Sequence, residues 1–346
     1  MTSPLTGLGL TSPVLAAPMS GGPTTPAMVI AAARAGGLGF VAAGYKTPEA
    51  LAAEISAVRA AGVPFGVNLF APNPVPVSVD AYRRYAQALT SVADRLGVTL
   101  PREPVENDDE FRAKVDLLLA EPVPVASFTF GIPGAAVIAD LKRAGTAVVQ
   151  TVTSVPEARA AADAGVDMLV VQSHLAGGHS ATLHPQRAPE PLAVGELVRA
   201  VSDTVGLPVI GAGGLSTAAD VSGVLGAGAA AAMVGTVLLL ADESGASPTH
   251  QRALTDPGRT ETVVTRAFTG RPARGLRNAF IDTYESQAPL GYPAIHHLTS
   301  PLRKAAAAAD EPELLHLWAG TGYRNTRRAP TEQILTELAA ASSAPE

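Results

Sequence analysis

Short apolar runs alternate with longer amphipathic segments along the first three quarters of the chain. Each apolar run follows Gly or Pro and leads into a segment with helical spacing, which is typical of a buried strand followed by a helix. The pattern predicts eight strands, at residues 13–18, 38–42, 64–70, 123–128, 147–151, 168–172, 208–212 and 230–234. Thr25 and Thr47 precede Pro at the start of two of the helices and are expected to cap them.

Repeated strand–helix units predict parallel strands joined by right-handed crossovers. Eight such units can close into an α/β TIM barrel, whose active site lies at the carboxyl ends of the strands. The alternative is an open doubly wound sheet. The glycine-rich loops suited to phosphate follow the seventh and eighth predicted strands, where barrels place them and dinucleotide-binding sheets do not. We therefore predict a TIM barrel over residues 1–261.

Two segments depart from the repeating pattern. Residues 71–122 contain a Pro-rich patch and an acidic patch around a helix expected near residues 80–96. We predict an inserted helical segment over the barrel mouth, and a plain long connection is the alternative. From residue 262 onward the strand–helix pattern is exhausted. Residues 262–346 are predicted to form a helical and loop extension that packs over the barrel mouth, near the active site.

Composition narrows the class of function. With 47% hydrophobic and 16% charged residues in a chain of 346, the protein is expected to bury a large core. The formal charge of −6 comes without a long basic run, which excludes a nucleic-acid footprint and disfavours an anionic membrane surface. The absence of cysteine excludes disulfides, iron–sulfur clusters and thiolate chemistry. Small-molecule chemistry is the remaining expectation.

Two features bear on localisation. No Lys or Arg precedes Arg34, so the basic region of a secretory signal is missing, and we expect a cytoplasmic protein. Residues 221–241 carry no charge, yet four glycines interrupt them. This stretch is expected to be a helix end, a buried strand and a helix start rather than a membrane span.

The strongest candidate for chemistry is the stretch at residues 166–185, VDMLVVQSHLAGGHSATLHP. A buried strand ends there at Gln172, and a glycine pair, Gly177 and Gly178, precedes His179. The pair lets the backbone approach a flat ligand, and an imidazole titrates near working pH, so His179 is the acid/base candidate. The same glycines argue against a helix that would gather the histidines around a metal, and no metal site is predicted. His174 and His184 are expected to be ordinary loop residues.

Short loops at other strand ends indicate a binding site for a ligand that has a phosphate group and a ring system. Backbone N–H groups exposed by glycines at a helix start bind phosphate, although glycine there can also serve only a tight turn. Polar side chains at strand ends can hydrogen-bond a ring lying between them and the phosphate loops. The candidates are Gly213, Gly214, Met233, Val234, Gly235 and Thr236 for the phosphate, Asn68 and Gln172 for the ring, and Ala17, Pro18 and Met19 beneath the ring. Met19 as ordinary core filling is the alternative for that residue.

The segments together resemble the FMN-dependent nitronate monooxygenases, formerly called 2-nitropropane dioxygenases. The resemblance rests on AAPMSGGPTTP, AGGLGFVAAGY, VNLFAP, VVQSHLAGGH, PVIGAGGL, AAMVGT, LLADESGASP, TRAFTGRPARGLRN and LHLWAGTG, in the family's order. It implies a TIM barrel with non-covalent FMN held by the loops above together with Gly177 and Gly178. His179 is then the catalytic base or the group that orients the nitronate.

The resemblance also implies a reaction. A nitronate gives one electron to FMN, the radicals react with O2, and a carbonyl compound and nitrite form, while neutral His179 can first take a proton from a nitroalkane. The expected partners are these small molecules, in a monomer or homodimer. Ser180, Tyr292 and Arg303 are implied as substrate-pocket residues, with surface packing as the alternative for the last two. The family has Gly where this chain has Ala181, so we expect the pocket beside His179 to differ.

Three other functions stay open at this point. The flavin-dependent enoyl-ACP reductases and NADH:quinone reductases share the AGGH segment and both phosphate loops, so an NADH-dependent flavin reductase is the first alternative. A flavin-free isomerase or aldolase acting on sugar phosphates is the second, although Lys46 is the only one of four lysines near a predicted strand end. A non-catalytic barrel is the third.

Overall fold

The computed structural model describes residues 4–340 and contains a closed barrel of eight parallel strands. The last strand pairs with the first, with Val14 opposite Ala232, so the barrel has no open edge. This confirms the predicted TIM barrel and the approximate position of all eight strands. In barrel order they are β1 (Val14–Ala16), β2 (Gly39–Ala42), β3 (Phe65–Ala71), β4 (Val125–Phe130), β5 (Ala147–Val152), β6 (Met168–Gln172), β8 (Val209–Ala212) and β9 (Ala231–Val234).

Each strand buries both of its faces, which explains why the strands are continuous apolar runs. Along β6, Met168 and Val170 belong to the cluster inside the barrel, whereas Leu169 and Val171 pack outward against the helices. Gly66 leaves room for an interior ring, because a Cβ at that position would lie 2.3 Å from the Phe40 side chain. The barrel interior is therefore a packed core, and any ligand must bind at its mouth.

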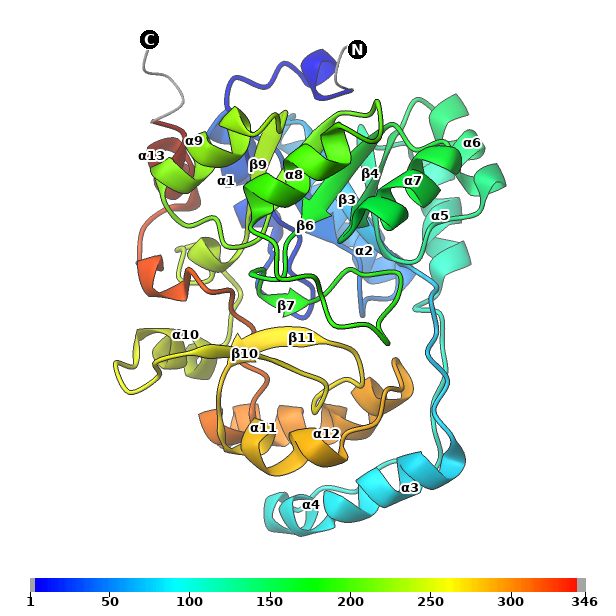
Figure 1. Cartoon of the computed structure of the whole chain (residues 1–346), viewed down its shortest axis with the longest axis vertical. Helices are drawn as coiled ribbons and strands as arrows, with labels where there is room; N and C mark the ends of the chain where they lie inside the picture. The colour runs from blue at the N-terminus through cyan, green and yellow to red at the C-terminus, as the bar shows by residue number, and fades with distance from the viewer. Residues whose placement is uncertain (1–3, 341–346) are drawn as a thin grey trace.

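Helices cover the outside of the barrel (Figure 1). As predicted, Thr25 and Thr47 cap the first two, each accepting a hydrogen bond from the amide three residues later, and Pro follows at the first helical position. The helices that follow the strands are α1 (Pro26–Arg34), α2 (Pro48–Ala60), α5 (Phe111–Ala120), α6 (Ala135–Arg143), α7 (Val155–Asp163), α8 (Val194–Ser202) and α9 (Ala218–Gly226). A short 3-10 helix, η1 (Pro4–Leu8), precedes β1.

Two helices lie on the barrel although the sequence places them in other segments. Helix α5 falls in the range predicted as an insertion, yet it packs against α2, α6 and β3 as the third barrel helix. Helix α13 (Thr331–Ala339) falls in the range predicted as an extension, but it returns to the barrel and packs against α1, α9 and β1. The Glu243 carboxylate accepts hydrogen bonds from the Thr331 amide and hydroxyl, which fixes the start of α13.

The remaining elements form a second body, the mouth lobe, at one end of the barrel (Figure 1). Its core contains Tyr82, Leu89, Phe268, Phe280 and Leu298, contributed by segments far apart in the sequence. The elements are α3 (Val79–Ala88), α4 (Thr90–Leu96), β10 (Thr262–Thr265), β11 (Ala273–Leu276), α11 (Ala279–Tyr284), η3 (Glu285–Gln287), α12 (Ala294–Ala308) and η4 (Pro312–Leu314). Between the barrel and this lobe lie η2 (Thr236–Leu238), α10 (Pro248–Thr255) and η5 (Tyr323–Asn325).

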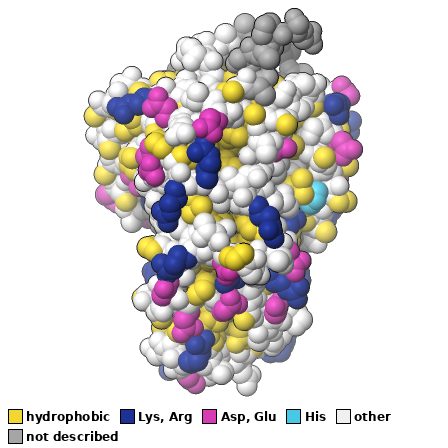
Figure 2. Space-filling view, turned by 90° about the vertical axis from the view of Figure 1, so that its left-hand side faces the viewer, with side chains coloured by type: hydrophobic (Ala, Val, Ile, Leu, Met, Phe, Trp, Pro, Cys, Tyr) yellow, Lys and Arg dark blue, Asp and Glu magenta, His cyan; other side chains and the backbone are white. Residues whose placement is uncertain are grey.

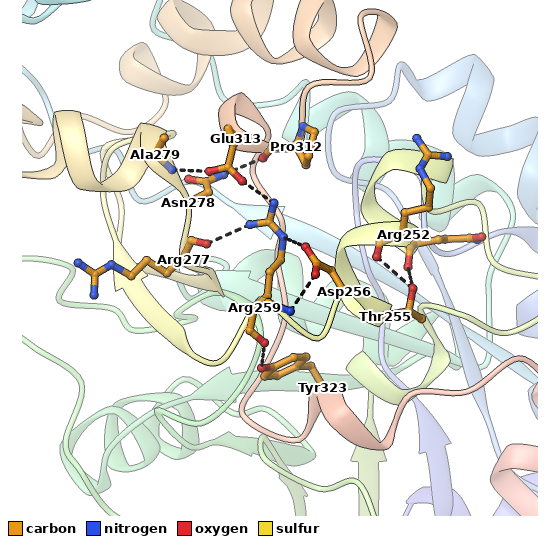
Figure 3. A network of polar contacts seen from close by, with 12 residues as sticks. Arg252, Thr255, Asp256, Arg259, Arg277, Asn278, Ala279, Pro312, Glu313 and Tyr323 are labelled. Atoms are coloured by element: carbon orange, nitrogen blue, oxygen red, sulfur yellow. Dashed lines mark hydrogen bonds and ion pairs between the residues drawn. The ribbon is translucent and has the colours of Figure 1, made fainter.

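A polar network ties the lobe to the chain that returns to the barrel (Figure 3). The Arg259 guanidinium donates to the Glu313 carboxylate at 2.6 Å and to the backbone oxygen of Arg277 at 3.1 Å. The Tyr323 hydroxyl donates to the backbone oxygen of Arg259 at 2.6 Å. Four separated segments thus meet at Arg259, whose guanidinium, a planar group with five donors, satisfies two of the acceptors while its backbone oxygen accepts from Tyr323.

The barrel and the lobe are also joined by a small antiparallel sheet in the order β10–β11–β7. Strand β7 (Gly178–His179) belongs to the loop after β6, and its His179 pairs with Ala273 of β11. The glycine-rich loop singled out in the sequence therefore forms part of the lobe's sheet.

The outer surface shows charges of both signs over both bodies. On the face in Figure 2, Lys and Arg side chains are interspersed with Asp and Glu, without a continuous patch of either sign. Within residues 4–340, none of the helices has the length and apolar character needed to cross a membrane.

The position of α13 gives a stability prediction. Replacing Leu335, which is fully buried between α13 and the barrel, with Ala should lower the free energy of unfolding by about 2–5 kcal/mol, because it leaves a cavity. Thr336→Ala, on the exposed face of the same helix, should change it by less than about 0.5 kcal/mol. Urea denaturation of both variants measures the difference, and equal effects would contradict a role for α13 in the barrel wall.

Candidate active site

A cavity of about 510 Å³ lies between the carboxyl ends of the strands and the mouth lobe. Among residues 4–340, the side chains and backbone that line it include no Asp and no Glu, whereas Arg303, Lys304 and four histidines do line it. Most site residues expected from the sequence meet at this cavity: Ala17, Pro18, Met19, Asn68, Gln172, Gly177, Gly178, His179, Gly213, Gly214, Met233, Val234, Gly235, Thr236 and Arg303. A carboxylate in the lining would repel a negatively charged ligand. Because the described lining has none, the cavity suits an anionic ligand.

Ser180 and Tyr292, also expected at the substrate pocket, do not line the cavity. Ser180 continues the strand pairing, and its amide donates to the backbone oxygen of Pro272 at 2.8 Å. Tyr292 lies behind the wall, with its ring centre 5.7 Å from that of His179 and its hydroxyl 3.3 Å from the hydroxyl of Tyr45. Both residues therefore support the cavity wall.

His179 is held at the cavity from two sides. Its backbone pairs with β11, and its Nε2 lies 2.9 Å from the Thr269 hydroxyl oxygen. Burial, followed by the positive charges of Arg271 and Arg303, lowers the pKa of His179 to about 3. The imidazole is therefore neutral at physiological pH and can accept a proton.

Gln172 clamps the loop that carries His179. Its side-chain amide donates to the backbone oxygen of His179 at 3.3 Å and accepts a hydrogen bond from the Ala181 amide at 2.8 Å. Ala181 is fully buried and does not have a positive φ. This explains why the chain can have Ala where the related family has Gly: the loop does not require the left-handed conformation at this position.

The two glycine loops form the opposite end of the cavity. Gly213 and Gly214 have φ of +99° and +78°, and a Cβ at Gly213 would lie 2.8 Å from the Ser173 hydroxyl. Within the described chain, the amides of Gly213, Gly214 and Gly235 have no hydrogen-bond acceptor. At the start of α9, the Asp220 carboxylate accepts hydrogen bonds from the amides of Ser216 and Thr217, so these two amides are already paired. The free glycine amides therefore provide donors for a phosphate group.

Asn68 provides an oriented acceptor between these loops and His179. Its side-chain nitrogen donates to the hydroxyls of Ser127 at 2.9 Å and Thr129 at 3.0 Å. Because these bonds fix the amide, its oxygen is left to accept a hydrogen bond from a ring N–H in the cavity. A phosphate cradle, a ring acceptor and the thioether of Met19 along one wall form a set that fits FMN.

The lobe contributes residues that the sequence alone does not single out. The ring of Tyr45 stacks on His296 with centres 4.3 Å apart, and both line the cavity. Tyr45 has a φ of 67°, and its amide donates to Asp109, which forms an ion pair with the buried Lys114 at 2.8 Å. Nothing local in the sequence pairs residue 45 with residue 296, because their contact depends on how the lobe folds over the barrel.

Arg303 is buried among neutral groups. Its guanidinium donates to the hydroxyl of Thr299 at 3.1 Å, to the Nδ1 of His296 at 3.2 Å and to the Nε2 of His316 at 3.4 Å. Because a guanidinium only donates, both imidazoles must accept and hence be neutral. Burial, followed by the charge of Arg303, keeps the pKa of His296 and of His316 well below the usual value. Arg303 itself remains charged, since burial lowers its pKa only to about 10.

Arg271 lies behind the cavity wall and is fully buried. Its side chain donates to the backbone oxygens of Ser180 and Thr182, and its guanidinium carbon lies 4.1 Å from the centre of the Phe130 ring. A cation over an aromatic face is stabilised by the ring quadrupole. The two buried arginines make this side of the cavity electropositive.

Comparisons with known proteins identify the family of the chain. The family model described as nitronate monooxygenase matches residues 2–341. A protein of Staphylococcus aureus strain Newman, named probable nitronate monooxygenase, is 35% identical over 336 residues, which cover 96% of this chain and 94% of that protein. The homologue from strain MRSA252 matches to the same extent.

Solved structures show the same architecture. The nitroalkane oxidase of Streptomyces ansochromogenes superposes with a TM-score of 0.92 at 44% identity, over 98% of this chain and 97% of that one. FabK from Thermotoga maritima superposes with a TM-score of 0.75 at 26% identity, over 99% of this chain and 96% of that one. Because the family model and the relatives cover almost the whole chain, barrel and mouth lobe together, this protein belongs to the nitronate monooxygenase family of oxidoreductases.

Proposed function

We propose that this protein is an FMN-dependent enzyme that uses O2 to convert alkyl nitronates, such as propionate 3-nitronate, into a carbonyl compound and nitrite. The observation that carries the proposal is His179, a neutral imidazole in a cavity that is lined by cations and, among the described residues, by no carboxylate. The names of the similar proteins, nitronate monooxygenase and nitroalkane oxidase, support the same chemistry.

The chain's own residues would hold FMN at the glycine loops. The free amides of Gly213, Gly214 and Gly235 would bind its phosphate, and Asn68 would accept from its ring. Once bound, FMN would supply the electron transfer between the organic substrate and O2. Gln172 would keep the His179 loop fixed while the ligand enters.

The site would act on two forms of the substrate, the neutral nitroalkane and its anion, the nitronate. A nitroalkane must first lose the proton on the carbon next to the nitro group, and the neutral imidazole can take it. A nitronate has already lost this proton and carries a negative charge, which the nearby Arg303 and Lys304 would attract.

An NADH-dependent flavin reductase is the second candidate, favoured by the structural similarity to FabK. The aldolase alternative loses support because Lys46 does not line the cavity and its ammonium pairs with Glu54 at 2.6 Å, while Lys304, which lines it, lies on α12 and not at a strand end. The expectation of a cytoplasmic monomer or homodimer that acts on small molecules stays a prediction.

An anaerobic titration distinguishes the two leading functions. Adding propionate 3-nitronate to the purified yellow protein should change its flavin absorption spectrum, whereas NADH should leave the spectrum unchanged. Subsequent O2 should release nitrite only from the nitronate sample. Bleaching by NADH, with no response to the nitronate, would support the reductase instead.

Replacing His179 tests its catalytic role. His179→Gln should lower kcat for a nitroalkane by about a hundredfold or more, the usual scale for losing acid/base assistance, with FMN content retained. His174→Gln is the matched control, because His174 lies in the same loop, its imidazole hydrogen-bonds to the backbone oxygen of Leu192, and it does not line the cavity. This control should stay within about threefold of the wild type. Similar losses in both variants would assign His179 a structural role.

The pH dependence follows from the low pKa of His179. Because its base form persists down to a pKa of about 3, kcat/KM for a neutral nitroalkane should not fall with an apparent pKa near 6.5 as the pH drops from about 7 to about 5. An ordinary exposed histidine would lose its base form, and with it the activity, across this range. Steady-state rates with nitroethane measure the profile, and a clear acidic limb centred near 6.5 that disappears in His179→Gln would refute the neutral buried base.

A further inference from the structure

We propose that Thr269 is a positioning residue that fixes the tautomer of His179, so that Nδ1 is the atom that takes the substrate proton. The assignment of a proton transfer to His179 rests on the proposed function, whereas the assignment of the tautomer rests on hydrogen bonding alone. Thr269 lies in the mouth lobe, just before β11, and 90 residues from His179 in the chain.

The contact is a short chain of three polar groups. The Nε2 of His179 lies 2.9 Å from the Thr269 hydroxyl oxygen, and this oxygen lies 3.2 Å from the backbone oxygen of Arg271. Arg271 is fully buried and Thr269 is 1% exposed, so the Arg271 carbonyl is shielded from bulk solvent. Among the described residues, Thr269 is the only hydrogen-bond donor to the Arg271 carbonyl.

One assignment of protons satisfies all three groups. A threonine hydroxyl has a single proton, and a carbonyl can only accept. If the hydroxyl donates to Arg271, its oxygen can accept the proton of Nε2, and every group is paired. If the hydroxyl instead donates to Nε2, the buried carbonyl is left without a donor, which is disfavoured. His179 therefore carries its proton on Nε2 and its lone pair on Nδ1.

Backbone contacts keep Thr269 in place. Its amide donates to the backbone oxygen of Arg266, and the next residue, Gly270, has a φ of +70° and accepts from the amide of Gly291. The Arg271 side chain is fixed by the backbone oxygens of Ser180 and Thr182, which follow His179 in the same loop. The His179 imidazole and the Arg271 carbonyl, the two ends of the three-group chain, are thus both held in place by neighbouring backbone.

The Nδ1 atom of the His179 imidazole is available to a ligand in the cavity. Nδ1 has no hydrogen-bond partner within residues 4–340, and His179 lines the cavity. In the proposed step, Nδ1 takes the proton from the carbon next to the nitro group, and the electron pair of the C–H bond becomes the C=N bond of the nitronate. The negative charge moves to the nitro oxygens, while the imidazolium keeps its Nε2–H bond to Thr269.

A pair of variants of the FMN-loaded enzyme tests the role in catalysis. Thr269→Val keeps the shape but removes the hydroxyl, and Thr269→Ser keeps the hydroxyl. With Val, kcat/KM for nitroethane should fall at least about tenfold more than kcat/KM for ethyl nitronate, which needs no proton removal. Ser should restore both values to within about threefold of the wild type. Equal losses for both substrates, or a Ser variant as impaired as the Val variant, would overturn the proposal.

An NMR measurement tests the tautomer directly and needs no turnover. In protein labelled with ¹⁵N in its imidazoles, the His179 signals are identified by their absence in His179→Gln. The wild type should show protonated Nε2 and unprotonated Nδ1, and Thr269→Val should show a mixture. A proton on Nδ1 in the wild type would overturn the proposal even if the Val variant did not fold. The expected tautomer in a protein inactive toward both nitronates and nitroalkanes would support the Thr269 assignment and refute the proposed function.

Discussion

The antiparallel pairing of β7 with β11 is the interaction on which the site depends. It joins a loop of the barrel to the sheet of the mouth lobe, with His179 opposite Ala273 and Gly178 opposite Arg274. Apart from this pairing, the long connection between β6 and α8 is held to the barrel by hydrogen bonds of Gln172 with His179 and Ala181, and by bonds that the Glu157 carboxylate accepts from Thr182 and Leu183. The lobe is therefore part of the scaffold that holds the candidate base. A substitution in the core of the lobe is expected to change the position of His179 and hence the activity.

Burial, together with buried positive charge, is the second constraint, and it keeps His179, His296 and His316 neutral. Arg271 and Arg303 are stabilised by backbone oxygens, imidazole nitrogens and an aromatic face rather than by contact with carboxylates. Such partners leave the charge uncancelled, and the Nη1 of Arg271 has no hydrogen-bond partner among the described residues. A protonated imidazole beside them would add a like charge in a poorly solvated region, so the pKa of His179 falls. The same excess of positive charge suits the cavity to a nitronate.

The barrel was predictable because each of its units is encoded locally, by an apolar strand, a cap and a helix of ordinary length. The cavity residues at strand ends, such as Asn68 and Gln172, were predictable for the same reason, since the fold places all strand ends together. Helical spacing does not specify the partner of a helix, so α5 and α13 could not be assigned to the barrel from sequence. Tyr45 and His296 could not be paired either, because their stacking arises only when the lobe packs on the barrel.

Backbone strain at the end of β4 indicates how tightly this strand is coupled to the loop that carries His179. Phe130 has a φ of 80°, which is rare for an aromatic residue and persists only where surrounding contacts require it. The Asn73 side chain donates both to the backbone oxygen of Phe130 at 2.8 Å and to that of Leu183 at 3.0 Å, four residues after His179. Because one amide joins the strained strand end to the histidine loop, neither can move alone. The Phe130 ring, 5.6 Å from that of His179, is thus held as a fixed wall against which a substrate must fit.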